Sequence, residues 1–254
     1  MDEEMEIYGG FADTYDIFMD NIPYGDWHTY LRKLLLKQGV SDGIVVDLGC
    51  GTGNMTRLLA EDGYDMIGVD MSAEMLEYAR QKCQESVLLL QQDMRKLELY
   101  GTAAAMICVC DGMNYLLETE DLRQVFRRVQ QFLDVGGVFV FDMKTAHFYE
   151  TQLGDRTITD NREDVTLIWD NVYHTDTGIN EYVLTIYQLS DDGNDLFERV
   201  DEHHVQRAYP CETVQRLLDE TGFSVESVYE AFTENMPGKD SERIYFVAKK
   251  LCEI

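Results

Sequence analysis

Hydrophobic positions up to residue 148 follow two alternating patterns. Short apolar runs rich in Val, Ile and Leu predict buried strands at residues 44–46, 64–70, 87–91, 104–110 and 138–142. Apolar residues at helical spacing predict helices at residues 31–38, 55–60, 73–83 and 121–133. This alternation of strand and helix favours an α/β fold with a Rossmann-like, doubly wound and mostly parallel sheet.

The pattern changes after residue 148. Polar and apolar residues alternate between residues 162 and 206, which predicts antiparallel strands. Turn-forming residues at 175–178 and 191–195 divide this stretch into three strands. We therefore expect a small antiparallel β cap, inserted at residues 149–206 after the fifth strand.

The C-terminal part returns to the first pattern. It predicts a helix at 211–220 and two more strands at 223–229 and 244–248. Together with the five earlier strands they make a seven-stranded sheet. Residues 1–148 and 207–254 are thus expected to form the main domain.

Aromatic residues gather near the N-terminus. Phe11, Tyr15 and Phe18 recur at helical spacing, which is typical of a helix packed on the domain. Alternatively, residues 1–40 form a helical lid in which Tyr15 and Tyr24 close over a ligand. Aromatic faces attract positive charge, so such a lid suits a cationic ligand. The sequence leaves both interpretations open.

The most informative stretch is residues 44–54, Ile-Val-Val-Asp-Leu-Gly-Cys-Gly-Thr-Gly-Asn. A strand, a glycine turn and a helix start are typical of ligand binding at the carboxyl ends of parallel strands. Glycine allows the unusual dihedrals of this turn and the close approach of a ligand to the backbone. Nicotinamide enzymes need Gly or Ala three residues after the second glycine, where this chain has Asn54. That departure disfavours an NAD-dependent oxidoreductase.

Asp70 ends the second predicted strand, about 20 residues after the glycine turn, where dinucleotide folds place an acid that binds ribose hydroxyls. Its other interpretation is a helix cap, although Ser72 is better placed to cap the next helix. We favour ribose binding.

Composition narrows the possible partners. The net charge of −27 repels phosphate backbones and no basic cluster offsets it, so free nucleic acid is not an expected partner. No apolar run reaches the length of roughly 20 residues that spans a bilayer, and the N-terminus is acidic, so we expect a cytoplasmic protein. The six cysteines lack zinc-site spacing, and no metal is expected.

The phrase Val-Asp-Leu-Gly-Cys-Gly-Thr-Gly resembles motif I of the class I S-adenosylmethionine (SAM) dependent methyltransferases. Two further segments resemble bacterial methyltransferases of the small-molecule type. They are the aromatic pattern Tyr-x-x-Phe-Ala-x-x-Tyr-Asp near the N-terminus and the run from Asp111 to Leu116. Enzymes that methylate nucleobases typically carry an Asn/Asp-Pro-Pro-Tyr/Phe motif at the latter position, and this chain has no proline there.

The resemblance implies a cofactor site for SAM, and for S-adenosylhomocysteine as product. It implies that Asp93 accepts from the adenine amino group, that the next residue offers its N–H to the ring, and that Met71 lies against adenine. The implied cofactor residues are Tyr15, Tyr24, Asp47, Gly49, Cys50, Gly51, Thr52, Gly53, Asp70, Met71, Met75, Asp93, Met94, Cys110 and Asp111.

Candidates for the methyl acceptor come from the segment after the fourth strand and from the insertion. We expect the acceptor to contact Asn114, Tyr115, His174 and Arg207. Candidates for a catalytic base are Tyr115, His204 and Tyr209, because a base is needed when the acceptor carries a proton. A turn cap is the alternative for Asn114, and a surface or salt-bridged side chain is the alternative for each histidine.

The sequence therefore predicts a SAM-dependent methyltransferase that acts on a nitrogen or oxygen of a small molecule. The insertion builds the acceptor pocket or a homodimer contact. An RNA- or protein-directed methyltransferase and a non-catalytic SAM-binding module remain alternatives.

Overall fold

The computed structural model describes residue 18 and residues 23–190 and 196–252. A seven-stranded sheet forms the centre of the main domain, in the order β10-β11-β5-β4-β1-β2-β3. Its strands are β1 (Ile44–Leu48), β2 (Asp65–Asp70), β3 (Leu88–Gln91), β4 (Ala103–Cys108), β5 (Leu133–Lys144), β10 (Phe223–Glu230) and β11 (Arg243–Lys250). All neighbours are parallel except β11, which runs antiparallel to both β5 and β10. The α/β fold class predicted from the sequence is confirmed.

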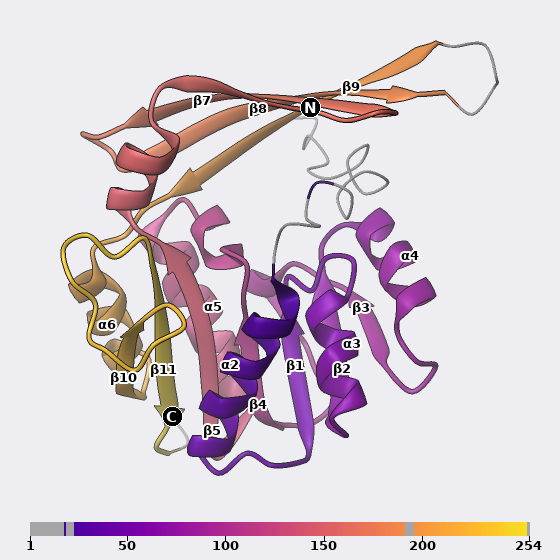
Figure 1. The fold of residues 1–254 in the computed structure, drawn as a ribbon. Helices are drawn as coiled ribbons and strands as arrows, with labels where there is room; N and C mark the ends of the chain where they lie inside the picture. The colour runs from indigo at the N-terminus through magenta and orange to yellow at the C-terminus, as the bar shows by residue number, and fades with distance from the viewer. Residues whose placement is uncertain (1–17, 19–22, 191–195, 253–254) are drawn as a thin grey trace.

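Helices cover both faces of this sheet (Figure 1). They are α2 (Tyr24–Lys37), α3 (Asn54–Glu61), α4 (Ala73–Lys82), α5 (Thr119–Phe132) and α6 (Cys211–Glu220). Helices α2 and α3 share one apolar cluster with Val45, Ile107 and Val140, while α5 and α6 share another with Val46 and Phe141. Successive strand residues point to opposite faces, so a strand apolar throughout forms two cores.

Helix α2 includes the helix predicted at residues 31–38 and extends it toward the N-terminus. It begins at Tyr24, and its residues Trp27, Tyr30 and Leu34 are buried against the sheet. The part of the predicted lid from Tyr24 onward is therefore part of the sheet's cover. Tyr15 and most of the predicted lid lie outside the described residues. Phe18 packs in an apolar cluster with cap residues.

The inserted cap is a separate antiparallel sheet of four strands, in the order β6-β7-β8-β9. Its strands are β6 (Arg156–Asn161), β7 (Val165–His174), β8 (Ile179–Leu189) and β9 (Phe197–Arg207). The sequence pattern predicts three of these. It does not predict β6, because the polar sequence Arg-Thr-Ile-Thr-Asp-Asn is almost wholly exposed, as an edge strand's side chains can be.

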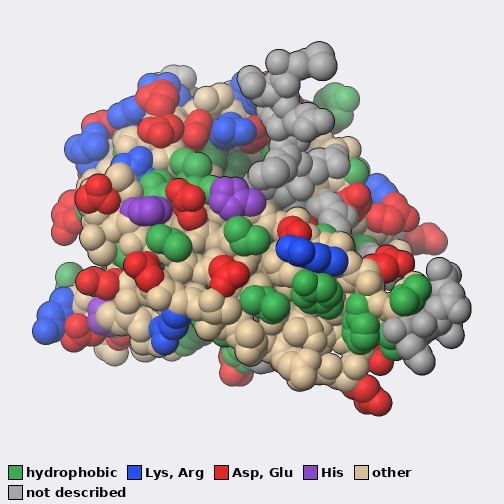
Figure 2. Space-filling view, turned by 90° about the horizontal axis from the view of Figure 1, so that it is seen from above, with side chains coloured by type: hydrophobic (Ala, Val, Ile, Leu, Met, Phe, Trp, Pro, Cys, Tyr) green, Lys and Arg blue, Asp and Glu red, His purple; other side chains and the backbone are tan. Residues whose placement is uncertain are grey.

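The cap lies above the carboxyl ends of the parallel strands (Figure 1). A six-residue π-helix, η3 (Phe148–Leu153), connects β5 to it. The inner face carries buried side chains such as Tyr182, Leu184 and His204, while Val183 and His203 are exposed. From above, the molecule shows acidic, basic and hydrophobic side chains intermingled (Figure 2). No helix in the described ranges is long and apolar enough to span a membrane.

Candidate functional site

The glycine turn after β1 has the conformation that its sequence predicts. Gly49, Gly51 and Gly53 all have positive φ, at 71°, 53° and 78°, where residues with a Cβ are strained. A Cβ at Gly51 would project into open space, whereas one at Gly53 would lie 3.0 Å from the Cβ of Ala79. Gly53 therefore permits close packing of α3 on α4, and Gly51 leaves space above the loop.

Asp70, at the end of β2, braces this loop. Its Oδ2 accepts from the Gly51 N–H at 2.8 Å, and its Oδ1 accepts from the Ser72 N–H at 2.9 Å. Ser72 Oγ accepts from the Met75 N–H, so Ser72 is the cap of α4, as expected. Burial raises the pKa of the Asp70 carboxyl, and the backbone hydrogen bonds reduce this rise without cancelling it. The loop is thus held in shape by the chain itself.

Two adjacent cavities open at the carboxyl ends of the strands. The larger has a volume of about 370 Å³, within the range of small-molecule sites. The predicted cofactor residues that line it are Gly49, Gly51, Asp70, Met71, Met75, Asp93, Met94 and Cys110. The smaller is lined by predicted residues Tyr24, Asp47, Gly49, Cys50, Gly51, Thr52 and Cys110. The cavities meet at Gly49, Gly51 and Cys110.

Several residues that line the two cavities are not among the site residues predicted from the sequence. Those of the larger cavity are Gln92, Arg95, Gly112, Leu116, Leu117, His203 and Val205, and those of the smaller are Asn54, Met55 and Val109. Most are neighbours of predicted residues, so proximity along the chain is a usable signal. His203 and Val205 flank the predicted His204, so the same signal applies to them, although the cap brings them to this cavity from about 90 residues away in the sequence.

Two acids beside these cavities differ in environment. Asp47 is buried and accepts from the Thr56 hydroxyl at 2.6 Å; burial raises the pKa of its carboxyl to about 6. Burial also raises the pKa of Asp93, but hydrogen bonds from the Arg95 side chain and backbone outweigh it, and the net shift is downward. Asp93 therefore stays an ionised acceptor beside the larger cavity.

The turn after β4 stores backbone strain at the junction of the two cavities. Cys110 and Asp111 are consecutive residues with positive φ, at 64° and 59°, and neither is glycine. Such a conformation costs on the order of 1–3 kcal/mol per residue and persists only where surroundings enforce it. Here Asp111 is fixed by Lys144 and Arg243, each at 2.9 Å, and by the Gln206 amide at 3.1 Å.

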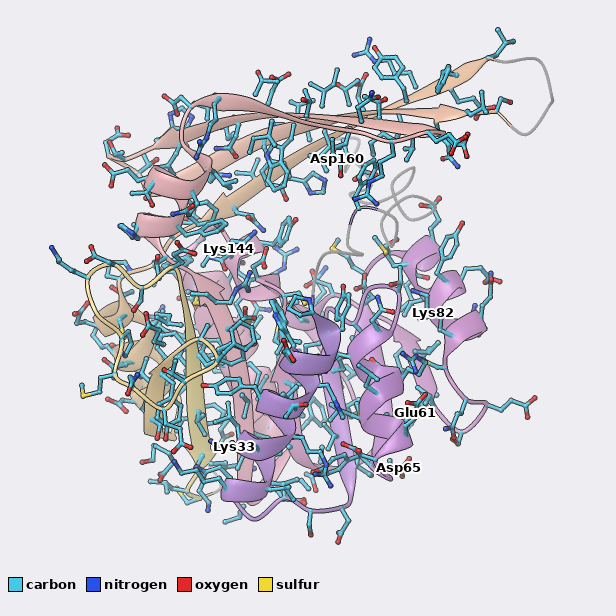
Figure 3. The ribbon with its side chains drawn as sticks, viewed as in Figure 1. Lys33, Glu61, Asp65, Lys82, Lys144 and Asp160 are labelled. Atoms are coloured by element: carbon cyan, nitrogen blue, oxygen red, sulfur yellow. The ribbon has the colours of Figure 1, made fainter. Side chains whose placement is uncertain are left out.

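This network shows what Asp111 contacts in the structure. Its carboxylate oxygens are engaged by the chain's own cations and it lines neither of these two cavities, so it braces the turn at Cys110, and its predicted contact with the cofactor stays a prediction. Burial alone would raise the pKa of the Asp111 carboxyl, but the charges of Lys144 and Arg243 outweigh burial, and the net pKa lies well below its usual value. Arg243 also pairs with buried Asp142, so the two carboxylates of Asp111 and Asp142 are balanced by the two cations of Lys144 and Arg243. Figure 3 shows Lys144 between the main sheet and the cap.

Three predicted acceptor-site residues lie elsewhere. The buried Asn114 amide bonds the backbone N–H and C=O of Lys144 and the C=O of Arg207, so it joins three segments instead of facing a ligand. The buried Tyr209 hydroxyl donates to the Leu116 carbonyl at 2.5 Å. His174 lies at the exposed end of β7, 3.6 Å from a carboxylate oxygen of Glu181.

Two of the other candidates, Tyr115 and His204, are in contact. Tyr115 lines the larger cavity, and its Oη is 3.2 Å from Nδ1 of buried His204 and 2.9 Å from Oη of Tyr182. Arg207 donates to the carbonyl of cavity-lining Leu117 at 2.7 Å, which fixes the wall. The sequence pattern predicts Tyr182 only as an apolar strand position, because alternation indicates burial and not hydrogen bonding.

The described residues hold no group of three or more His, Cys, Asp and Glu side chains placed to bind a metal ion. The open space above Gly51, the cavity volume and the carboxylates at the strand ends fit an adenosyl sulfonium ligand with ribose hydroxyls and an amino group.

Comparison with known proteins identifies the family. Residues 45–137 match the methyltransferase domain family. The chain is 34% identical over 247 residues to the putative methyltransferase YqeM of Bacillus subtilis, which covers 96% of this chain and 97% of the relative. The chain belongs to the class I SAM-dependent methyltransferases, which confirms the family predicted from the sequence.

Solved structures extend the likeness to the cap. The chain is similar to a SAM-dependent methyltransferase from Clostridium acetobutylicum, with a TM-score of 0.83 and 25% identity over 96% of this chain and 98% of the other. It shares its fold with SAM-bound CalS10 of Micromonospora echinaspora, an amino pentose methyltransferase, with a TM-score of 0.73 and 18% identity over 94% and 96% of the two chains.

Proposed function

We propose that this methyltransferase transfers the methyl group of SAM to a nitrogen or oxygen of a small molecule that binds between the sheet edge and the cap. The observation that carries this proposal is the junction at Cys110 and Tyr115. The larger cavity runs from the glycine loop, through Cys110, to Tyr115 and the cap residues His203 and Val205. One continuous space thus joins the cofactor residues to the cap.

In this proposal the chain's own residues bind the two halves of SAM. Asp70 accepts from the ribose hydroxyls, and Asp93 accepts from the adenine amino group while the Met94 N–H faces the ring. Tyr24, Asp47, Cys50 and Thr52 surround the smaller cavity, where the amino-acid part fits.

SAM supplies an already activated methyl group, so the protein has mainly to align the acceptor and exclude water. The strained turn at Cys110 supports this alignment because Asp111, Lys144 and Arg243 fix its backbone. The cap covers the strand ends and limits access of solvent to the reacting atoms. Tyr115, which lines the larger cavity and contacts His204, is the group that would take a proton from the acceptor in this proposal.

Two observations support a small acceptor rather than RNA. The net charge of −27 opposes a phosphate backbone, and the partly buried cations Lys144 and Arg243 are already paired with acids. An amino sugar is one acceptor of this size, and CalS10, which shares the fold, is an amino pentose methyltransferase. Protein-bound RNA and a protein side chain are outcomes of the test below.

The test is methyl transfer from SAM with a labelled methyl group. The full chain is incubated with a library of small amines and alcohols, with ribosomal RNA and with cell protein, each separately. Label in a member of the library supports the proposal. Label only in RNA or protein, or SAM binding without any transfer, contradicts it.

A further inference from the structure

A carboxylate and an imidazole lie side by side on the inner face of the cap. Glu202 and His204 are two residues apart on β9, so their side chains share a face. Both are buried, with side-chain exposures of 5% and 1%, and His204 Nε2 is 3.1 Å from Glu202 Oε2. A buried carboxylate is costly unless paired, so this contact is a built feature of the strand.

The other nitrogen of the imidazole faces the phenols. His204 Nδ1 is 3.2 Å from Tyr115 Oη, which in turn is 2.9 Å from Tyr182 Oη. The His204 ring stacks on Tyr182, with ring centroids 4.7 Å apart and planes 12° apart. Burial raises the pKa of Tyr182 well above its usual value, so this phenol keeps its proton and donates.

These contacts are consistent with one direction of hydrogen-bond donation along the chain of side chains. A carboxylate only accepts, so the arrangement in which Glu202 and His204 hydrogen-bond as carboxylate and neutral imidazole has the ring proton on the nitrogen facing Glu202. The lone pair of Nδ1 then accepts from the Tyr115 hydroxyl, and the Tyr115 oxygen accepts from Tyr182. Tyr115 lines the larger cavity, so the chain of donors reaches from the cavity to the buried carboxylate.

We propose that Tyr115, His204 and Glu202 form a proton relay in which Glu202 is the positioning residue. The inference rests on the proposed methyl transfer and names how its proton leaves. As the acceptor's lone pair attacks the methyl carbon, the bond from carbon to sulfur breaks and its electron pair stays on sulfur. The proton of the acceptor nitrogen or oxygen passes to Tyr115 Oη. The proton of Tyr115 passes to His204 Nδ1, and Glu202 faces the resulting imidazolium.

The relay also narrows the acceptor class. It serves a primary or secondary amine or a hydroxyl, each of which must lose a proton on methylation. A tertiary amine or a thioether has no such proton and gains nothing from Tyr115.

The first arm of the test needs no acceptor. The full chain labelled with ¹⁵N-histidine is studied by long-range ¹H–¹⁵N NMR, and His204→Gln identifies the signals of His204. The relay predicts a neutral ring with its proton on Nε2 and none on Nδ1. A neutral ring with its proton on Nδ1 and none on Nε2 would overturn it.

The second arm uses Glu202→Gln, which keeps the shape and a hydrogen-bond acceptor but removes the charge. With a library member that accepts the methyl group, kcat should fall about 10- to 100-fold, the range found when the carboxylate partner of a metal-bound histidine is lost. The acceptor KM and the Kd for SAM should stay within about twofold, because Glu202 contacts neither in this mechanism. The matched control is Glu198→Gln, the same change on the same strand at an exposed position.

The outcomes separate the two proposals. Absence of SAM binding, or no methylated library member, defeats the proposed function. Methyl transfer with an unchanged kcat in folded Glu202→Gln leaves that function standing and overturns the relay. Tyr115→Phe removes the hydroxyl that links cavity and imidazole, and should lower kcat by about 100-fold or more.

Discussion

Replacing Asp70 by alanine tests the cofactor site most sharply, because this carboxylate has a structural and a ligand-binding role. Its two oxygens accept from the N–H groups of Gly51 and Ser72 at 2.8 and 2.9 Å. Each carboxylate oxygen can accept more than one hydrogen bond, so capacity remains for the ribose hydroxyls. Asp70 also lines the larger cavity.

The magnitude follows from these contacts. A hydrogen bond to a charged group contributes about 1.5–3 kcal/mol, so loss of the ribose contact should weaken SAM binding roughly 10- to 150-fold. The N–H groups of Gly51 and Ser72 lose their acceptor as well, which costs about 1–3 kcal/mol of folding free energy for each group that stays buried. The variant should therefore unfold at a lower temperature.

The assay is calorimetric titration of the folded variant with S-adenosylhomocysteine and with its 2′,3′-dideoxy analogue. Removing the ribose hydroxyls should weaken binding to the native chain and have little further effect on Asp70→Ala. The matched control is Asp65→Ala at the opposite, exposed end of the same strand (Figure 3). Equal sensitivity of the native chain and Asp70→Ala to the dideoxy change would refute ribose binding by Asp70.

Three further predictions concern pH, packing and assembly. Burial raises the pKa of Asp47 to about 6 in the folded chain, so the folded state favours its protonated form and this contribution to stability is lost as the pH rises through 6. The free energy of unfolding should therefore fall by at most about 3 kcal/mol between pH 4 and pH 6. Asp47→Asn should reduce this pH dependence, as measured by chemical denaturation. Asn114→Ala leaves backbone groups of Lys144 and Arg207 without their side-chain partner, which should lower the free energy of unfolding by about 3 kcal/mol. A fall in the melting temperature of less than about 2 °C would contradict the bracing role of Asn114. We also propose that the protein forms a homodimer through the exposed outer face of the cap, on which Val183 lies. Light scattering should then give twice the mass of the chain, and Val183→Asp should give the mass of one chain.

The glycine turn and its partners could be predicted because their signal is local. Gly49, Gly51 and Gly53 adopt positive φ, and Asp70 lies at the end of the adjacent parallel strand, where its carboxylate meets the turn. A short sequence pattern specifies this unit completely. The central strands could be predicted for a similar reason, since burial on both faces makes them apolar throughout.

Residues in the acceptor region are harder to assign because their partners are far away in the sequence. Asn114 is bonded across 30 and 93 residues, and Tyr209 across 93, so neither bracing role has a local pattern. The pairing of Tyr115 with His204 spans 89 residues and depends on where the cap lies. Strand β6 escapes prediction because a polar, exposed edge strand has no hydrophobic pattern.

Calorimetric titration of the full chain with SAM, with S-adenosylhomocysteine and with NAD tests the cofactor assignment itself. We expect binding of the first two in the micromolar range, one molecule per chain, and no binding of NAD. Absence of heat with SAM, in folded protein shown to carry no bound nucleoside, would contradict the cofactor site described for Gly51, Asp70 and Asp93.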